Sequence, residues 1–328
     1  MAAEEAVHGA HSEHSQGDAW SGGKVPFKAS YGKLMMWYFL LSDAFTFAAF
    51  LIAYGALRFS MPTWPLPDVV FSTFPGGIHH APLIFVTVMT FILIVSSVTM
   101  VRAVQEGHRE NQKGVVFWML LTVVGGLTFL GCQAWEWNTL INGEYMSVTR
   151  NTFGSHAEGG VYLDDEHGHA YKTGTEGEKF EAGDTYLLHA YHADGGHGDG
   201  HGDDHGDDHG AAHSDDKAHA HKPHTIEDRP GKEGAVEFIS RRFTTESGAS
   251  SHQTFGPYQF GALFFCITGF HGFHVFSGVA FLLIILLNVA SGIYAERKNG
   301  YEMVEKIGLY WHFVDLVWVF VFLVFYLL

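Results

Sequence analysis

The chain has 328 residues, of which 47% are hydrophobic, and it carries 35 Asp and Glu against 19 Lys and Arg. Most of the net charge of -16 falls between Asn151 and His252, a segment with 21 acidic and 8 basic residues. Because no basic face is available to neutralise phosphates, this composition argues against nucleic-acid binding.

Long stretches without charge predict a membrane protein. No Asp, Glu, Lys or Arg occurs between Gln253 and Ala295, which is ample for a membrane-crossing helix. The residues up to Gly23 lack the apolar run of a cleavable signal peptide. Five spans are expected, at about residues 34–57, 81–104, 114–138, 256–290 and 307–328. The predicted fold class is all-α, an integral membrane five-helix bundle with a large, mostly disordered extramembrane insert.

The spans divide the chain into four regions. These are a flexible cytoplasmic tail at 1–33, three helices within 34–138, an acidic His-rich periplasmic insert at 139–255, and two helices within 256–328. The orientation follows from Lys and Arg in the short loops, which mark the cytoplasmic side. Nearly all of them lie in the tail and in the turns at 105–113 and 296–306, whereas the opposite short loop offers only Arg58. The sequence therefore predicts a multi-pass protein of a bacterial inner membrane, with insert and C-terminus in the periplasm.

The insert contains a low-complexity segment of Gly, Asp and His that cannot form a packed core. In it a histidine recurs every fourth residue: His197, His201, His205, His209 and His213. Such imidazoles bind transition metals weakly and in many geometries. There are two other interpretations: a hydrated acidic spacer, or an acidic docking surface for a basic electron carrier or a neighbouring complex. The flanks at 160–191 and 225–245 show alternating apolar positions and are expected to form short strands.

Few ionisable groups lie within or at the ends of the spans, and they are the candidate site residues: Asp43, Glu136, His271, His274, His312 and Asp315. Each is either a buried polar group that ties helices together or, for Asp43 above all, a proton-handling site. The histidines at depth are too few for several haems and a copper, and no cysteine cluster assists them. No catalytic residue, bound cofactor or metal at depth is therefore predicted for this chain.

The histidines also suggest how the last two spans pack. His271 and His274 share one helix face, and His312 and Asp315 share a face of the next helix, because residues three apart lie on the same side. The two helices run antiparallel, so the sequence predicts a single polar seam between them through these four side chains.

Two motifs in the last two spans carry a resemblance. The sequence Gly269-Phe-His271-Gly-Phe-His274-Val-Phe-Ser-Gly278, followed by Tyr310-Trp-His312-Phe-Val-Asp315-Leu-Val-Trp318, resembles subunit III of the haem-copper oxidases, the cytochrome c oxidase subunit III family. Gln133-Ala-Trp-Glu136-Trp and Gly256-Pro-Tyr-Gln-Phe-Gly261 add to it. The likeness covers about residues 30–150 and 255–328 in a five-helix form, and the insert lies outside the family pattern. Where the family usually has Ser-Glu, this chain has Ser42-Asp43.

The resemblance implies a non-catalytic subunit of a proton-pumping terminal oxidase, which reduces oxygen to water in aerobic respiratory electron transport. It implies that haem and copper belong to partner subunits. It also implies that this chain binds structural phospholipid, stabilises catalytic subunit I and supports proton uptake there. In that setting a cytochrome c or a neighbouring respiratory complex is the partner expected if the insert is a docking surface. An accessory subunit of a quinol oxidase or nitric-oxide reductase, or a stand-alone metal transporter suggested by the His-rich loop, are the alternatives.

Overall fold

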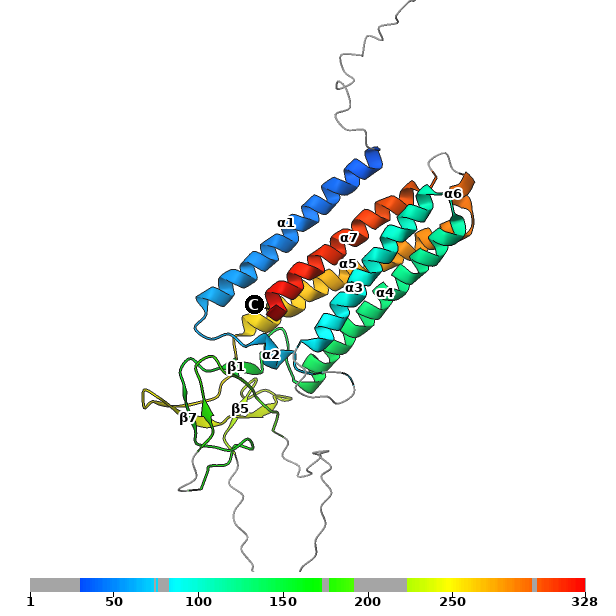
Figure 1. The fold of residues 1–328 in the computed structure, drawn as a ribbon. Helices are drawn as coiled ribbons and strands as arrows, with labels where there is room; N and C mark the ends of the chain where they lie inside the picture. Colours follow the sequence, from blue (N-terminus) through cyan, green and yellow to red (C-terminus); the bar gives the residue numbers. More distant parts are fainter. Residues whose placement is uncertain are drawn as a thin grey trace, which may run out of the picture.

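The structure is a computed structural model that describes residues 30–73, 75, 83–172, 177–191, 223–296 and 300–327. Five long helices lie roughly side by side, and a small strand-containing unit covers one end of them (Figure 1). The long helices are α1 (Tyr31–Ser60), α3 (Ile84–His108), α4 (Gln112–Asn138), α5 (Tyr258–Ala290) and α7 (Glu302–Phe322). All five are long and apolar enough to cross a membrane, so the predicted five-helix membrane fold is confirmed.

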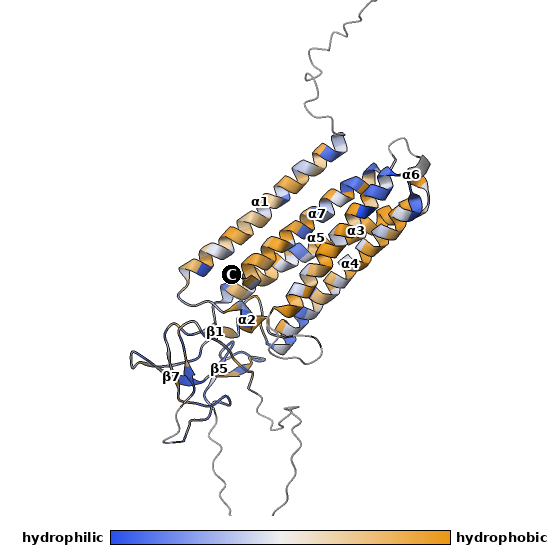
Figure 2. Cartoon of the chain, viewed as in Figure 1, coloured by the Kyte–Doolittle hydropathy of each residue, from blue (hydrophilic) through white to orange (hydrophobic). Residues whose placement is uncertain are grey.

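The spans extend slightly beyond their predicted limits. Both α4 and α7 continue into a turn of π-helix, η1 (Thr139–Gly143) and η2 (Leu323–Leu327), and short helices α2 (Pro67–Val70) and α6 (Ile293–Glu296) lie in the connections. Figure 2 shows the five spans as mainly hydrophobic surfaces and the strand-containing unit as mainly hydrophilic. The contrast follows from the solvent, because hydrocarbon offers no hydrogen bonds and favours helices that satisfy their own backbone.

The helix α7 lies at the centre of the packing, since it contacts α1, α3 and α5. The helix α4 contacts α3 and α5. One close approach depends on a glycine: a methyl group on Gly126 would lie 2.6 Å from the ring of Trp311 and 2.6 Å from a methyl of Val279. Small residues allow helices in a membrane to come this close. The packing of α4 against α5 and α7 thus requires glycine at position 126.

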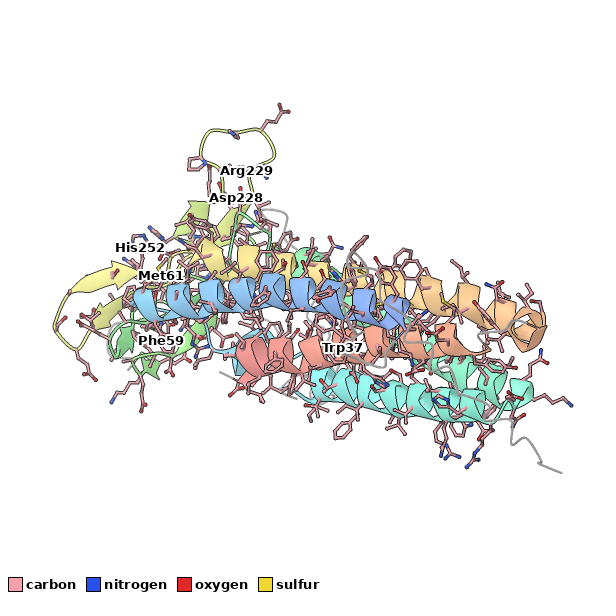
Figure 3. The ribbon with its side chains drawn as sticks, turned by 90° about the horizontal axis from the view of Figure 1, so that it is seen from above. Trp37, Phe59, Met61, Asp228, Arg229 and His252 are labelled. Carbon is pink, nitrogen blue, oxygen red and sulfur yellow. The ribbon has the colours of Figure 1, made fainter. Side chains whose placement is uncertain are left out.

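The first long helix is the least buried of the five. Only Leu40, Phe47 and Tyr54 are buried along α1, and large apolar side chains such as Trp37 and Phe59 project from it (Figure 3). At the end away from the insert, Lys33 forms an ion pair of 2.8 Å with Glu305 at the start of α7. The helix is therefore fixed to the bundle along a narrow stripe and exposes the rest of its apolar surface.

The described part of the insert contains eight short strands, which agrees with the strands expected in its flanks. They are β1 (Phe153–Ser155), β2 (Gly160–Tyr162), β3 (Lys179–Phe180), β4 (Thr185–Leu187), β5 (Thr225–Glu227), β6 (Glu237–Ile239), β7 (Arg242–Thr245) and β8 (Ser250–His252). All pairings between them are antiparallel: β1 with β4, β5 with β6, and a four-stranded sheet in the order β3-β2-β7-β8.

A small aromatic cluster holds the insert together. The ring of His156 stacks on Phe180 at 3.7 Å between centroids, and Tyr162 and Phe243 pack beside it. Its Nε2 lies 2.7 Å from the hydroxyl of Tyr162, which also accepts a hydrogen bond of 2.9 Å from the amide of Gln253. Burial among these groups lowers the pKa of His156 to about 4. The histidine therefore serves as a neutral ring that joins β1 to the four-stranded sheet.

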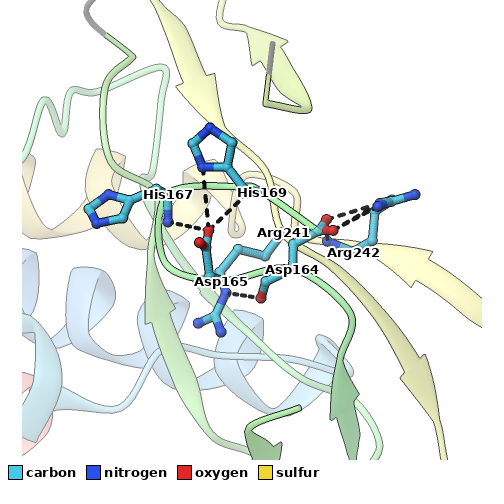
Figure 4. Close-up of polar contacts among 6 residues, drawn as sticks. All are labelled: Asp164, Asp165, His167, His169, Arg241 and Arg242. Atoms are coloured by element: carbon cyan, nitrogen blue, oxygen red, sulfur yellow. Dashed lines mark hydrogen bonds and ion pairs between the residues drawn. The ribbon is translucent and has the colours of Figure 1, made fainter. Parts of the chain in front are cut away.

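Hydrogen bonds around one buried carboxylate connect the loops of the insert (Figure 4). The Asp164 side chain is fully buried and accepts hydrogen bonds from the backbone and guanidinium of Arg242 at 2.7 to 3.2 Å. Although burial alone would raise the pKa of Asp164, these bonds hold it below its usual value. Its neighbour Asp165 accepts from the backbone N–H groups of His167 and His169.

Few hydrogen bonds attach the insert to the bundle. The backbone N–H of Leu66, just before α2, donates to the hydroxyl of Thr185 at 2.8 Å. Asn151 pairs with Gly256 immediately before α5 and donates from its side chain to the carbonyl of Pro257 at 3.1 Å. The insert therefore rests on the ends of α1 and α5 through its own strands.

Candidate functional site

Two ionisable side chains that are 231 residues apart in the sequence meet between α1 and α5. The Nε2 atom of His274 lies 3.2 Å from an oxygen of Asp43. Both side chains are largely enclosed, with relative exposures of 9% for His274 and 17% for Asp43. The ring of Phe47, one turn along α1 from Asp43, packs against His274 at 5.4 Å between centroids. The pair is thus held in apolar surroundings by both helices.

The hydrogen bonds of this pair determine how many protons it holds. The Nδ1 atom of His274 lies 2.8 Å from the backbone carbonyl of Phe270. A carbonyl can only accept, so Nδ1 carries a proton and Nε2 of the neutral ring is an acceptor. A carboxylate is also only an acceptor. A hydrogen bond between His274 and Asp43 therefore requires one additional proton, which belongs either to the carboxyl or to an imidazolium.

An open groove borders this pair. It has a volume of about 580 Å³, its walls come from α1, α5 and α7, and most of its lining is apolar. His274, Ser277 and Tyr310 line one part of it and Lys306 another. The hydroxyls of Ser277 and Tyr310 lie 2.8 Å apart, and Tyr310 also donates to the carbonyl of His274 at 3.1 Å. The groove thus leads from a basic side chain to the polar groups beside Asp43.

His271 does not join this pair, although it is one turn from His274. Its Nε2 donates to the carbonyl of Val314 in α7 at 3.0 Å, and its Nδ1 is buried without a partner among the described residues. The ring packs between Trp318 and Phe129. His271 therefore connects α5 to α7 as a neutral side chain whose second nitrogen is unused.

The predicted single seam through four side chains is wrong. In α7, His312 turns toward α3, where its Nδ1 lies 2.6 Å from the hydroxyl of Ser97. The carboxyl of Asp315 faces the same serine. His274 contacts α1 instead. Residues three apart do share a helix face, but the rotation of each helix determines which neighbour that face meets.

Glu136 belongs to a separate cluster near the end of the bundle covered by the insert. It is buried and accepts hydrogen bonds from the hydroxyl of Tyr326 at 3.1 and 3.2 Å and from the amide of Gln133 at 3.0 Å. Tyr326 lies in the π-helical turn η2. This arrangement connects the end of α4 to the end of the chain.

The sequence analysis missed Ser97, Tyr310 and Tyr326 as polar partners within the bundle. Serine gives little signal because in a helix its hydroxyl usually bonds a carbonyl of its own preceding turn. The tyrosines lie within apolar runs, where their rings alone explain their presence. One signal was available for Tyr310, since it immediately precedes the Trp311-His312 motif.

The histidines from His197 to His213 lie outside the described residues, so their expected weak metal binding stays a prediction. Within the ranges that the structure describes, no three His, Cys, Asp or Glu side chains come together as a metal-ligand group.

Comparison with known proteins identifies the C-terminal part of the chain. A model of the family "Cytochrome c oxidase subunit III" matches residues 237–328. Cytochrome c oxidase subunit 3 of Drosophila melanogaster is 43% identical over 92 residues, which is 28% of this chain and 30% of that protein. The protein from Schizophyllum commune is 48% identical over 67 residues, covering 20% and 24%. A probable cytochrome c oxidase subunit 3 from the bacterium Rickettsia bellii is 44% identical over 59 residues, covering 18% and 21%.

The matches have a limited extent, since the chain spans between a quarter and a third of the length of the first curated relatives. The family match includes α5 and α7 with His271, His274, His312 and Asp315, whereas Asp43 and Glu136 precede it. Residues 237–328, which contain α5 and α7, are therefore similar to the cytochrome c oxidase subunit III family, and the fold of the chain contains five apolar helices.

Proposed function

We propose that this chain is the non-catalytic subunit III of a proton-pumping terminal oxidase that reduces oxygen to water. In this proposal haem and copper are held by other subunits, and the chain stabilises the catalytic subunit and supports its proton uptake. The observation that carries the proposal is the Asp43–His274 pair, in which one residue of the family-matched helix α5 holds a carboxylate from α1.

The proton-supply role rests on the chemistry of the pair. A carboxyl and an imidazole in direct contact share one proton, and either group can hold it. The pair lies beside a groove lined by Ser277 and Tyr310, whose hydroxyls bond each other and the backbone carbonyl of His274, so the polar side of the groove is next to the pair. Asp43 is the only Asp, Glu, Lys or Arg between Lys33 and Arg58. We assign proton supply to this pair and a structural role to Glu136 and His271.

The groove also fits a phospholipid. Its walls are apolar side chains of α1, α5 and α7, among them Met36, Phe39 and Phe281, and Lys306 supplies a cation. An acyl chain in this groove would be held by van der Waals contacts with these apolar side chains, because it leaves lipid and not water when it enters. The ammonium of Lys306, held 3.5 Å from Glu302, would meet the anionic head group. A bound lipid of this kind would fill the space between α1 and the rest of the bundle.

The distribution of charge supports an orientation in which the insert is periplasmic. Lys33, Arg109 and Lys306 belong to the end of the bundle away from the insert (Figure 1), and such short-loop cations mark the cytoplasmic side. A reporter enzyme that works only in the periplasm, fused within the insert at Gly200, should be active. The same reporter fused in the turn after α3 should be inactive.

Purification from native membranes in a mild detergent tests whether the chain is an oxidase subunit. The account expects other membrane subunits to co-purify, an absorption spectrum with haem bands, and oxygen consumption by the preparation. A colourless preparation of this chain alone, which transports a divalent metal after reconstitution, would contradict the proposal and support a transporter.

A further inference from the structure

The polar group between α3 and α7 lacks partners among the described residues, and one of its unpartnered atoms lies on the outer surface of the bundle. Ser97 contacts His312 and Asp315. One carboxyl oxygen of Asp315 is fully enclosed and has no hydrogen-bond partner among the described residues. The Nε2 atom of His312 likewise has no partner in the described part of the chain, and it is not enclosed.

Hydrogen-bond counting shows what this group still needs. If Nδ1 of His312 donates to Ser97, the serine hydroxyl is free to donate to Asp315, and Nε2 of the neutral ring becomes an acceptor. If Ser97 donates to His312 instead, Nε2 carries the proton and Asp315 loses its donor. In both arrangements Nε2 of His312 has no partner among the described residues.

The surroundings of this nitrogen are apolar and exposed. The side chains of Val98 and Val101 in α3 and of Leu316 in α7 are 58%, 53% and 55% exposed. Water does not reach such a surface inside a bilayer, and lipid tails offer no hydrogen bonds. An unsatisfied polar atom in hydrocarbon is costly, so a protein side chain is a better neighbour for His312 than an acyl chain.

We infer that the face formed by α3 and α7 around His312 binds a transmembrane helix of another subunit, which places a hydrogen-bonding side chain against Nε2 of His312. A helix packs well here because Ser97 is small, and because the flanking valines and leucine give an apolar surface with a single polar point. Asparagine, glutamine, serine, threonine or tyrosine on the partner helix would fit. The inference concerns assembly and stands apart from the proton-supply role proposed for Asp43 and His274.

Photocrosslinking in the intact complex tests this inference. A photoreactive amino acid replaces Leu316, and a matched probe replaces Val124 on the exposed surface of α4. The two positions lie within about one helical turn of the same depth, because His312 of α7 bonds Ser97 of α3 and Thr122 of α4 bonds Thr99 of α3. The Leu316 probe should form an adduct within a transmembrane segment of a co-purifying subunit, identified by peptide mass spectrometry. The inference would be overturned if the Leu316 probe formed adducts with lipid alone. It would also be overturned if the two probes formed adducts with the same subunit in equal yield.

Three variants of His312 examine the polar contact itself. Glutamine places an amide near Nε2, asparagine places one near Nδ1, and leucine removes both groups. H312Q should keep the Leu316 crosslink, while H312N and H312L should reduce its yield by between about threefold and eighteenfold, the range expected for one interhelical hydrogen bond in a membrane. Equal yields in all three would show that apolar packing alone holds the partner and would reject the contact with Nε2. A crosslink from a complex without haem would keep this inference and reject the oxidase proposal.

Discussion

The bundle and the insert satisfy their buried polar groups in different ways. In the bundle, polar side chains occur as small groups brought together from distant helices, as Asp43 and His274 are. In the insert, polar side chains bond both to nearby backbone, as Asp165 does with His167 and His169, and to distant charged groups, as Asp164 does with Arg242. Hydrocarbon around the bundle makes each unpaired polar group costly in free energy. Water around the insert can form hydrogen bonds with polar groups that have no protein partner. Polar groups in the bundle are therefore few and each has a specific partner helix, as Asp43 and His274 do, whereas those in the insert hold its strands and loops together.

The largest effect is expected at the closest helix contact. Replacing Gly126 with valine places atoms where Trp311 and Val279 already lie and should destabilise the bundle by about 3 kcal/mol, at the upper end for overpacking. Thermal unfolding in detergent measures this change. Gly131→Val is the matched control, since a methyl group there meets no atom within 4 Å. Equal losses for both variants would mean that β-branching in α4, and not contact with Trp311, causes the effect.

Acid should affect the insert before the bundle. The pKa of His156 is lowered to about 4 from 6.5, so the unfolded insert binds a proton more readily than the folded one. The stabilisation is complete above about pH 6.5 and is lost as the pH falls toward 4, by on the order of 2 kcal/mol.

Limited proteolysis between pH 7 and pH 4 measures this loss, because cleavage at Arg241 and Arg242 reports opening of the insert. His156→Phe keeps the ring stacking but cannot titrate, and it should reduce the pH dependence over that range, with the remainder due to His189, whose pKa burial also lowers. A variant that becomes susceptible at the same pH as the original protein would show that another group is responsible.

Replacing residues 192–222 with a short Gly-Ser linker should have the smallest effect on stability. The residues on both sides of this segment pair with one region: Tyr191 donates to the carbonyl of Glu237 at 2.7 Å, and Ser240 donates to that of His224 at 2.8 Å. The linker should leave thermal unfolding and oxygen consumption unchanged. Calorimetric titration with zinc should show that weak sites are lost. Failure of the oxidase to acquire copper would contradict a spacer-like role.

The sequence predicted the five helices because charge-free length and hydrocarbon thickness decide membrane spans almost independently of tertiary contacts. The ionisable residues that it singled out lie in the long helices: Asp43, Glu136, His271, His274, His312 and Asp315. It did not predict their partners, because the spacing of His271 and His274 places them on one face but does not say which helix that face meets. No pattern in the sequence pointed to Ser97. The contact of His156 with Phe180 brings two strands together, and the alternation of apolar residues does not specify which strands are neighbours.

The central claim is that Asp43 and His274 hold a proton for the oxidase. Asp43→Asn tests it most directly, because the amide keeps the size and hydrogen bonding of the carboxyl but cannot exchange its proton. Oxygen consumption by the purified complex, measured as the pH is raised, should fall in this variant at a lower pH than in the original protein, while the complex keeps all its subunits. Identical pH profiles in an intact complex would show that Asp43 only fastens α1 to α5.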